Sequence, residues 1–165
     1  AYLSHLFQHQ IKPLWYIHSV HHTDHNVDIT TSNRHHPIES VIRFIFTFLA
    51  IIVSGAPIGL VLIYQSISVI LAQFTHANIS LPRRVDKILS YIIVSPDMHK
   101  VHHHFELPHT DSNYGNIFSI WDRIFGTYTE LDKKDIIYGV DTDFDEIKNS
   151  KILSLLYKPF DKIFR

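Results

Sequence analysis

VIRFIFTFLAIIVSGAPIGLVLIYQSISVILAQF, residues 41–74, is an apolar stretch with a single charged residue, Arg43, near its start. As one straight helix it would run about 51 Å, well over the roughly 30 Å hydrocarbon core of a bilayer. Proline and glycine end helices, and SGAPIG at residues 54–59 interrupts the stretch in its middle. The pattern therefore predicts a helical hairpin in a membrane. The alternative is a pair of core helices in a soluble protein, which few domains of this size could cover on all sides.

A hairpin returns the chain to the side from which it came, so the segments before and after it share one side of the membrane. The hairpin turn carries no charge, whereas the flanks are basic, with Lys12, Arg34, Arg43, Arg83, Arg84, Lys87 and Lys100. The positive-inside rule then predicts that both flanks face the cytoplasm. The first arm is short for a full span, so a start near Ile38, a tilt or a re-entrant path all remain open.

The remaining features favour one all-α domain over residues 1–165, a membrane hairpin with a histidine-rich helical cap. Residues 1–22 read as two short helices around Pro13, and residues 26–39 as an irregular connection. After the hairpin come a short amphipathic helix within residues 83–94 and a last apolar helix over residues 152–160. Because histidines lie so close to Ala1, we expect further elements upstream, so that this sequence would be an N-terminally truncated member of its kind.

Histidine is the most informative residue type, with 14 among 165 residues and concentrations at residues 1–39 and 76–128. Lysine and arginine number 15 against 16 acidic residues, so no net basic field favours nucleic acid as a partner. There is no cysteine, which excludes thiolate metal sites and disulfides. Any metal would therefore be held by nitrogen and oxygen ligands.

The motif His-x-x-His-His occurs at residues 18–22 and again at residues 99–103, and His5 and His9 add a pair four residues apart. On a helix, positions i, i+3 and i+4 share a face, so we expect each box to project three imidazoles toward a common point. His76, directly after the hairpin, is a ninth candidate. One first-row metal takes at most about six ligands, so nine imidazoles indicate two ions. A solvated face or a pH-sensing cluster is the alternative, but neither requires repeated helical spacing.

Five segments carry a resemblance to a known family: YLSHLFQH, LWYIHSVHHTD, RHHPIE, FTHANI and SPDMHKVHHHFELPHTDSNYGNIFSIWDRIFGTY. Together they resemble the fatty acid hydroxylase/sterol desaturase superfamily of integral-membrane non-haem di-iron oxygenases. The resemblance covers residues 2–128, with three histidine boxes in the family's order. It implies two ferrous ions in a cytosolic cap, and a reaction that uses O2 and two electrons to hydroxylate or desaturate a membrane lipid.

Carried over by position, the resemblance implies nine metal ligands, namely His5, His9, His18, His21, His22, His76, His99, His102 and His103. The family commonly has an arginine where this chain has Leu6, and some members have a histidine where it has Ser80. These departures leave the completeness of one metal's ligand set open.

Metal-bound imidazoles usually donate their other N–H to a carboxylate or a carbonyl. Neighbouring residues that could support the ligands in this way are His36, in its His-Pro-x-Glu element, His104, Asp24, Asp28, Glu39, Asp97, Asp111 and Asp122. His104 follows His103 directly and would point about 100° away from it around a helix. We therefore expect His104, like His109 and His25, to lie beside the ligands or in solvent.

The leading hypothesis is an oxidoreductase that hydroxylates, more than it desaturates, a lipid. The glycines form no nucleotide or flavin motif, so electrons must come from outside, and the family resemblance implies cytochrome b5, a ferredoxin or a reductase. The lipid itself stays open among fatty acyl, sterol, carotenoid and ether classes. A non-enzymatic metal-binding or transport protein is the alternative, although no His, Asp or Glu lies within residues 41–74. A zinc hydrolase would want the HExxH motif, which does not occur.

Overall fold

The computed structural model describes residues 1–163, and in that range it is helical, with β-pairing confined to isolated bridges. The all-α prediction is confirmed. Two short helices, α1 (Tyr2–Gln10) and α2 (Lys12–His22), come first. Pro13 lies in the first turn of α2, where its missing N–H costs no hydrogen bond, so it starts this helix rather than interrupting one. A single 3-10 turn, η1 (Thr31–Asn33), interrupts the irregular connection that follows.

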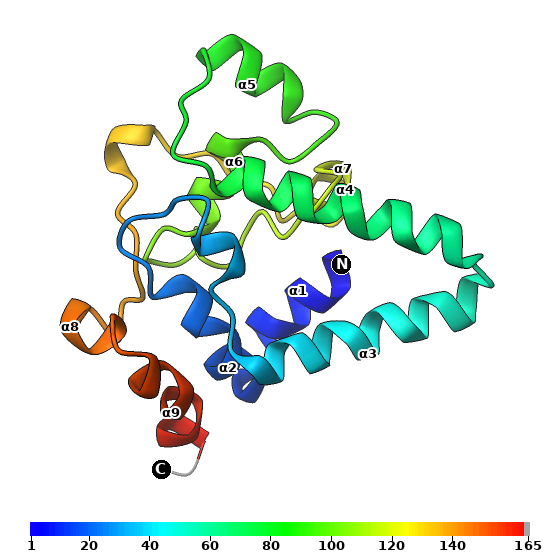
Figure 1. Cartoon of the computed structure of the whole chain (residues 1–165). Coiled ribbons are helices and arrows are strands. Elements are labelled where there is room, and N and C mark those ends of the chain that lie inside the picture. The colour runs from blue at the N-terminus through cyan, green and yellow to red at the C-terminus, as the bar shows by residue number, and fades with distance from the viewer. Residues whose placement is uncertain (164–165) are drawn as a thin grey trace.

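The predicted hairpin consists of α3 (Pro37–Ser54) and α4 (Ile58–His76), which meet at a sharp turn (Figure 1). Gly55 ends α3 in the left-handed conformation, φ +63°, and its N–H bonds to the carbonyl of Ile51. That conformation is the usual glycine C-terminal cap. Helix α3 starts at Pro37, before the apolar run at residues 41–74, which agrees with the predicted alternative of a start near Ile38. His36 caps it by accepting a hydrogen bond from the backbone N–H of Ile38.

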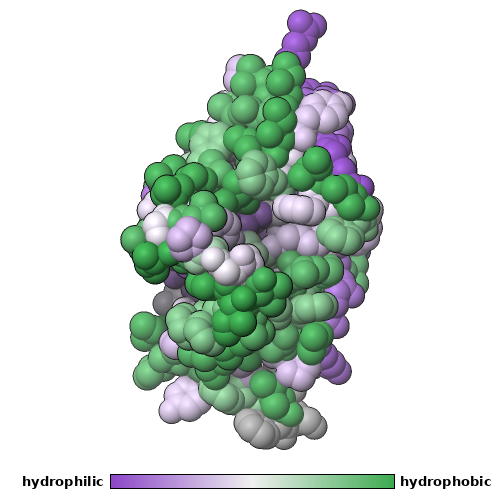
Figure 2. All heavy atoms as spheres, turned by 90° about the vertical axis from the view of Figure 1, so that its right-hand side faces the viewer, coloured by the Kyte–Doolittle hydropathy of each residue, from purple (hydrophilic) through white to green (hydrophobic). Residues whose placement is uncertain are grey.

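Both hairpin helices are long and apolar enough to cross a membrane, and little of either is covered by protein. Only 6% of the apolar window of α3 and 11% of that of α4 is buried. Buried core helices of a soluble protein would show the opposite, so that alternative does not fit. In Figure 2 this side of the molecule is dominated by hydrophobic side chains, with a more polar hollow near its middle. These exposed apolar helices associate the chain with a membrane.

The histidine-rich segments gather at the open end of the hairpin. Helix α1 packs on α2 and α3, and α6 (Pro96–His102) packs on α4. Ser95 caps α6 by accepting from the N–H of Met98. The amphipathic helix predicted within 83–94 is shorter, α5 (Arg83–Leu89), because Ile93 instead forms an isolated antiparallel bridge with Phe118.

The rest of the chain wraps this centre with short elements. They are α7 (Ile120–Ile124), η2 (Lys133–Asp135), α8 (Glu146–Asn149) and α9 (Ile152–Ile163). The predicted last helix is present as α9, which packs on α2. Helix α9 begins at Ile152, which is the first residue of the predicted range 152–160.

The loop before α7 is built on a buried carboxylate. Asp122 accepts hydrogen bonds from the backbone N–H groups of Tyr114 (2.7 Å) and Gly115 (2.9 Å) and from the Thr127 hydroxyl (2.8 Å). Asn113 enters this loop with φ +53°. Asp122 was predicted as a partner of an imidazole, but its oxygens organise this loop instead. The loop in turn presents the carbonyl of Tyr114 to His5, so it belongs to the support of the histidine centre.

A methyl group at Gly115 should destabilise the fold by about 1–3 kcal/mol, the usual cost of overpacking. Its Cβ would lie 2.7 Å from Asp122 Oδ2 and 2.9 Å from the Phe118 carbonyl, neither of which can move without breaking the loop. Gly59→Ala is the matched control, since nothing lies within 4 Å of that position and alanine favours the helix. Thermal unfolding in detergent should rank Gly115→Ala below the parent and Gly59→Ala at or above it. Equal midpoints for the two variants would contradict the loop's role.

Candidate metal centre

All nine predicted ligands converge, but in two adjacent groups rather than one. In each group the ligand nitrogens lie within 4.8 Å of one another. The five-histidine cluster comprises His5, His9, His18, His22 and His102. The four-histidine cluster comprises His21, His76, His99 and His103. Eight of the nine are buried and His5 is half-buried.

The expectation that each box aims at one common point is wrong, because each box is split between the clusters. His18 and His22 belong to one cluster and His21 to the other; likewise His102 separates from His99 and His103. On a helix, i and i+4 are about 40° apart, while i+3 falls about 60° to the other side of i. A single box therefore reaches two neighbouring points.

Contacts between the clusters show that they lie side by side. The rings of His22 and His103 stack with centroids 4.6 Å apart, and those of His99 and His102 stack at 5.3 Å. His18 and His21 approach to 5.3 Å. Two ions held here would be near neighbours, as in a dinuclear site.

Contacts on the outer side determine which nitrogen faces inward for four members of the five-histidine cluster. The Nδ1–H of His5 donates to the Tyr114 carbonyl (2.9 Å) and that of His102 to the Ser112 carbonyl (2.7 Å). His18 Nδ1 lies 3.0 Å from Glu39 Oε1, and His9 Nδ1 lies 3.1 Å from Asp111 Oδ1. Each neutral ring has only one N–H, so every Nε2 in this set carries a bare lone pair.

Those lone pairs face one another. His5 Nε2 and His18 Nε2 are 3.2 Å apart, and the Nε2 atoms of His9 and His102 are buried without a hydrogen-bond partner. Two bare lone pairs at that distance repel unless a cation lies between them. Nitrogens on one ion, at ligand distances of about 2.1 Å, lie about 3.0–3.4 Å apart. The cluster therefore fits a metal ion better than a hydrogen-bond network.

The surroundings of His76 show that the four-histidine cluster also fits a metal ion better than a hydrogen-bond network. Its Nδ1–H donates to the Ala72 carbonyl at 2.7 Å, which leaves one lone pair on Nε2. Three other Nε2 atoms surround that lone pair, those of His99 at 3.0 Å and of His21 and His103 at 3.2 Å. One lone pair cannot accept three hydrogen bonds, whereas one metal ion can accept all four nitrogens.

Burial favours the neutral form of eight of the nine imidazoles, and the neutral form is the one that binds metal. Burial lowers the pKa of His102 to about 3, and neighbouring imidazoles reinforce the effect. Burial first, and then nearby histidines, also lowers the pKa of His5, His9, His21, His22, His99 and His103 well below the usual value.

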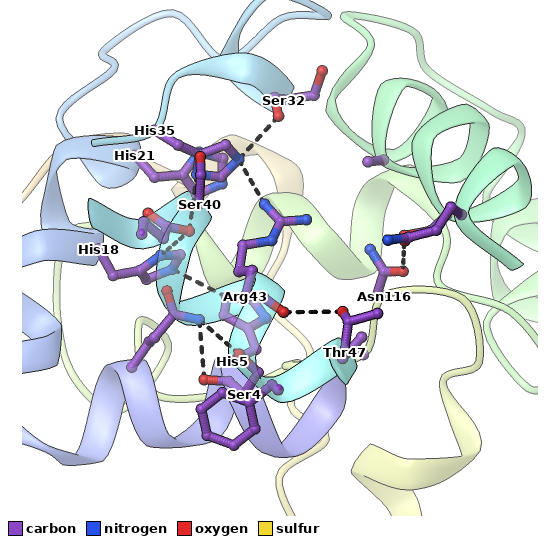
Figure 3. A pocket seen from close by; sticks show the side chains of 18 of the residues that line it. Ser4, His5, His18, His21, Ser32, His35, Ser40, Arg43, Thr47 and Asn116 are labelled. Carbon is purple, nitrogen blue, oxygen red and sulfur yellow. Dashed lines mark hydrogen bonds and ion pairs between the residues drawn. The ribbon is translucent and has the colours of Figure 1, made fainter. Parts of the chain in front are cut away.

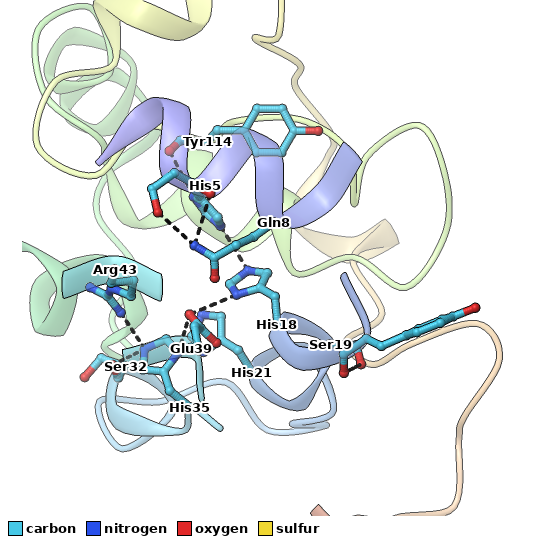
Figure 4. A network of polar contacts seen from close by, with 12 residues as sticks. His5, Gln8, His18, Ser19, His21, Ser32, His35, Glu39, Arg43 and Tyr114 are labelled. Atoms are coloured by element: carbon cyan, nitrogen blue, oxygen red, sulfur yellow. Dashed lines mark hydrogen bonds and ion pairs between the residues drawn. The ribbon is translucent and has the colours of Figure 1, made fainter. Parts of the chain in front are cut away.

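Among the other residues named from the sequence, two touch the ligands. Glu39 Oε1 contacts Nδ1 of both His18 and His35, at 3.0 and 2.9 Å, and Asp111 contacts His9. Figure 4 shows Glu39 beside His18, with His35 below it. His35 is the residue that the sequence reasoning passed over in favour of its neighbour. Its ring stacks on that of His21 with centroids 4.5 Å apart, and its position four residues before Glu39 could have signalled the contact.

The remaining candidates lie outside both clusters. His36 caps α3 and bonds to the Leu156 carbonyl through Nε2. His104 accepts from the N–H of Ile137, 3.1 Å away, and is buried rather than solvent-exposed. The carboxylates Asp24, Asp28 and Asp97 bond to Thr31, Thr30 and Lys133 respectively. His25 faces Glu146, and His109 lies against His104.

The fold and the site together define a class, that of helical membrane proteins with two adjacent histidine clusters that could hold metal ions. The fatty acid hydroxylase family model matches residues 1–127, and the chain belongs to that family.

Individual relatives agree with this assignment. The chain is 26% identical over 127 residues to an ornithine lipid hydroxylase of Rhizobium tropici, covering 77% of this chain and 38% of that protein. It is 30% identical over 143 residues to the alkylglycerol monooxygenase of Danio rerio, covering 84% and 30%. The human alkylglycerol monooxygenase is 25% identical over 142 residues, covering 84% and 30%. The chain thus spans 30–38% of the length of these relatives. No solved structure matches it.

The lowered histidine pKa values predict that the metal-free chain is acid-labile. Unfolded histidines take up protons near pH 6.5, whereas the buried ones do not, so the stability present above that pH is lost as the pH falls. Each such residue removes up to about 1.4 kcal/mol per pH unit. Chelator-treated protein should therefore unfold at lower temperature at pH 5 than at pH 7, and bound metal should raise the unfolding temperature at pH 7. A melting temperature independent of pH between 5 and 7 would show that these rings are not buried neutral.

Glu39→Gln should weaken metal binding about 10- to 100-fold, the usual effect of removing a carboxylate that orients a ligand histidine. The amide can still accept from His18 but no longer carries the charge that raises the basicity of that imidazole. Glu146→Gln is the matched control, because Glu146 also faces a histidine, His25 at 3.9 Å, but is exposed and remote from both clusters. Metal titration of both variants measures the difference. A metal affinity of Glu39→Gln equal to that of the control would show that Glu39 does not support metal binding.

Proposed function

We propose that this chain forms the catalytic core of an O2-dependent lipid hydroxylase with two iron ions held by the two histidine clusters. The observation that carries the proposal is the convergence of nine imidazoles into two adjacent groups whose Nε2 atoms face one another. An all-imidazole set suits iron, as well as copper, nickel and zinc. Family membership and the relatives named as a lipid hydroxylase and as monooxygenases support iron and hydroxylation.

The chemistry that a bound di-iron group supplies is hydroxylation of an unactivated C–H bond. One atom of O2 enters that bond and the other leaves as water, with two electrons and two protons consumed. No nucleotide or flavin motif occurs in the sequence, so we infer an external electron donor such as cytochrome b5, a ferredoxin or a reductase. Desaturation of the same lipid would need the same donor and is the alternative outcome.

The residues of this chain hold, orient and shield the centre. Glu39, Asp111 and the carbonyls of Tyr114 and Ser112 fix which ring nitrogen faces the metal position. Burial of the rings excludes bulk water, which protects reactive intermediates from side reactions. A cavity of about 330 Å³ adjoins both clusters and extends between α3 and α4, so a lipid could reach the centre from the bilayer (Figure 3).

The proposed orientation places the histidine clusters on the cytoplasmic side. The basic residues before and after the hairpin support it, because the turn at residues 54–59 carries no charge. A cytoplasmic centre would also be accessible to soluble or membrane-anchored electron donors.

His102→Ala should abolish lipid oxidation and remove at least one of two irons per chain, whereas His104→Ala should retain both metals and most activity. His102 is a member of the five-histidine cluster, while His104 bonds to the backbone of Ile137. Iron analysis of anaerobically purified protein and lipid profiling of cells expressing each variant in a full-length protein measure the two effects. Full metal loading and lipid oxidation in His102→Ala would contradict the ligand assignment. Protein that holds one zinc and consumes no O2 would instead favour the metal-binding alternative.

A further inference from the structure

Arg43 is a charged residue within an apolar helix, and its guanidinium extends into the cavity beside the metal centre (Figure 3). It lies about 9 Å along α3 from the first residue of that helix. A cation at such a position is costly and usually serves a function. The question is what it binds.

Within the described residues Arg43 has no carboxylate partner at ion-pair distance. The nearest acid in sequence, Glu39, is engaged by His18 and His35. The side-chain contact of Arg43 is with His35, whose Nε2 lies 3.1 Å from Nη1. A guanidinium has five N–H donors, and the contact with His35 uses one of them, so the others have no partner among the described residues.

The cavity is suited to a polar head with an apolar tail. Its volume of about 330 Å³ is at the lower end of the range for small-molecule sites. Thr47, Gln65 and Ser68 add polar groups around Arg43, whereas Phe44 and Phe46 give it an apolar side. The cavity is walled by the two helices that face the bilayer, and Figure 2 shows a more polar hollow opening within that hydrophobic side. A molecule from the bilayer therefore has access to it.

We propose that Arg43 binds the anionic headgroup, a phosphate or a carboxylate, of the lipid that is oxidised. The planar guanidinium matches both groups through paired hydrogen bonds. The proposal rests on the lipid oxidation proposed above and narrows its substrate class to anionic lipids. His35 joins this subsite to the centre, since it contacts Arg43 on one side and the ring of His21 on the other.

Lipid binding to the metal-loaded full-length protein tests this without turnover. The protein is kept anaerobic in neutral detergent, and bound lipid is counted by mass spectrometry of the intact complex. Dioleoyl phosphatidic acid is compared with dioleoylglycerol, and oleate with oleyl alcohol, so that only the headgroup differs. We expect the anionic member of each pair to bind about tenfold more tightly, and Arg43→Gln to abolish that preference.

Three further variants distinguish binding in the cavity from attraction by general surface charge. Arg84→Gln removes an exposed arginine outside the cavity and should leave the preference intact. Thr47→Trp fills the cavity without touching the charge and should reduce binding of the anionic lipid at least as much as Arg43→Gln. Phe48→Trp, on the exposed side of α3, should not. If Arg43→Gln disturbs metal loading through His35, the comparison of Thr47→Trp with Phe48→Trp still shows whether the anionic lipid binds in the cavity.

Several results would overturn the proposal. They are an unchanged preference in Arg43→Gln, an equal loss in Arg84→Gln, or no effect of Thr47→Trp. Competition by inorganic phosphate at concentrations matching the lipid would assign the site to a free anion rather than to a headgroup. A headgroup preference without any lipid oxidation under reducing, aerobic conditions would contradict the hydroxylase function but not the headgroup site. Lipid oxidation with no headgroup preference would contradict only the proposed role of Arg43 in headgroup binding.

Discussion

His5 and His18 face each other across 3.2 Å, and each has already given its one N–H to an oxygen on its outer side. Burying such a pair without a cation leaves two lone pairs in repulsion and two polar atoms without a partner, at a cost of about 1–3 kcal/mol for each unsatisfied group. The same situation recurs around His76. The rest of the fold depends on this constraint, because the core at this end of the molecule is built of imidazoles rather than of aliphatic side chains.

The surrounding structure supplies what the imidazoles require. The hairpin places His76 at the last residue of α4, where its Nδ1 can still donate to a carbonyl of its own helix. The loop around Asp122 presents the Tyr114 carbonyl to His5 across 109 positions of sequence. Glu39, in the first turn of α3, joins the membrane helix to the centre. The membrane hairpin and the histidine clusters are therefore parts of one structure.

Much of this could be predicted from residue spacing. The length and apolar character of residues 41–74, with SGAPIG in the middle, indicated the hairpin. The repeated His-x-x-His-His spacing selected six of the nine histidines that converge, the i, i+4 pair added His5 and His9, and the position after the hairpin added His76. Both signals are local, because helix length, helix breaking and the spacing of faces depend on neighbouring residues alone. The support around the ligands was harder to foresee. Of the six nearby carboxylates named from the sequence, Glu39 and Asp111 contact the predicted ligands.

By itself the sequence determined the secondary-structure class, the membrane hairpin and the identity of the candidate ligands, since these follow from local periodicity and side-chain chemistry. Only the tertiary structure decided how the ligands divide. Each His-x-x-His-His motif contributes to both clusters because helices α1, α2, α4 and α6 meet around two points, and no spacing within one helix specifies where another will lie. The same holds for His35 in place of His36, and for the cavity into which Arg43 extends. Those features arise from packing between residues far apart in the chain.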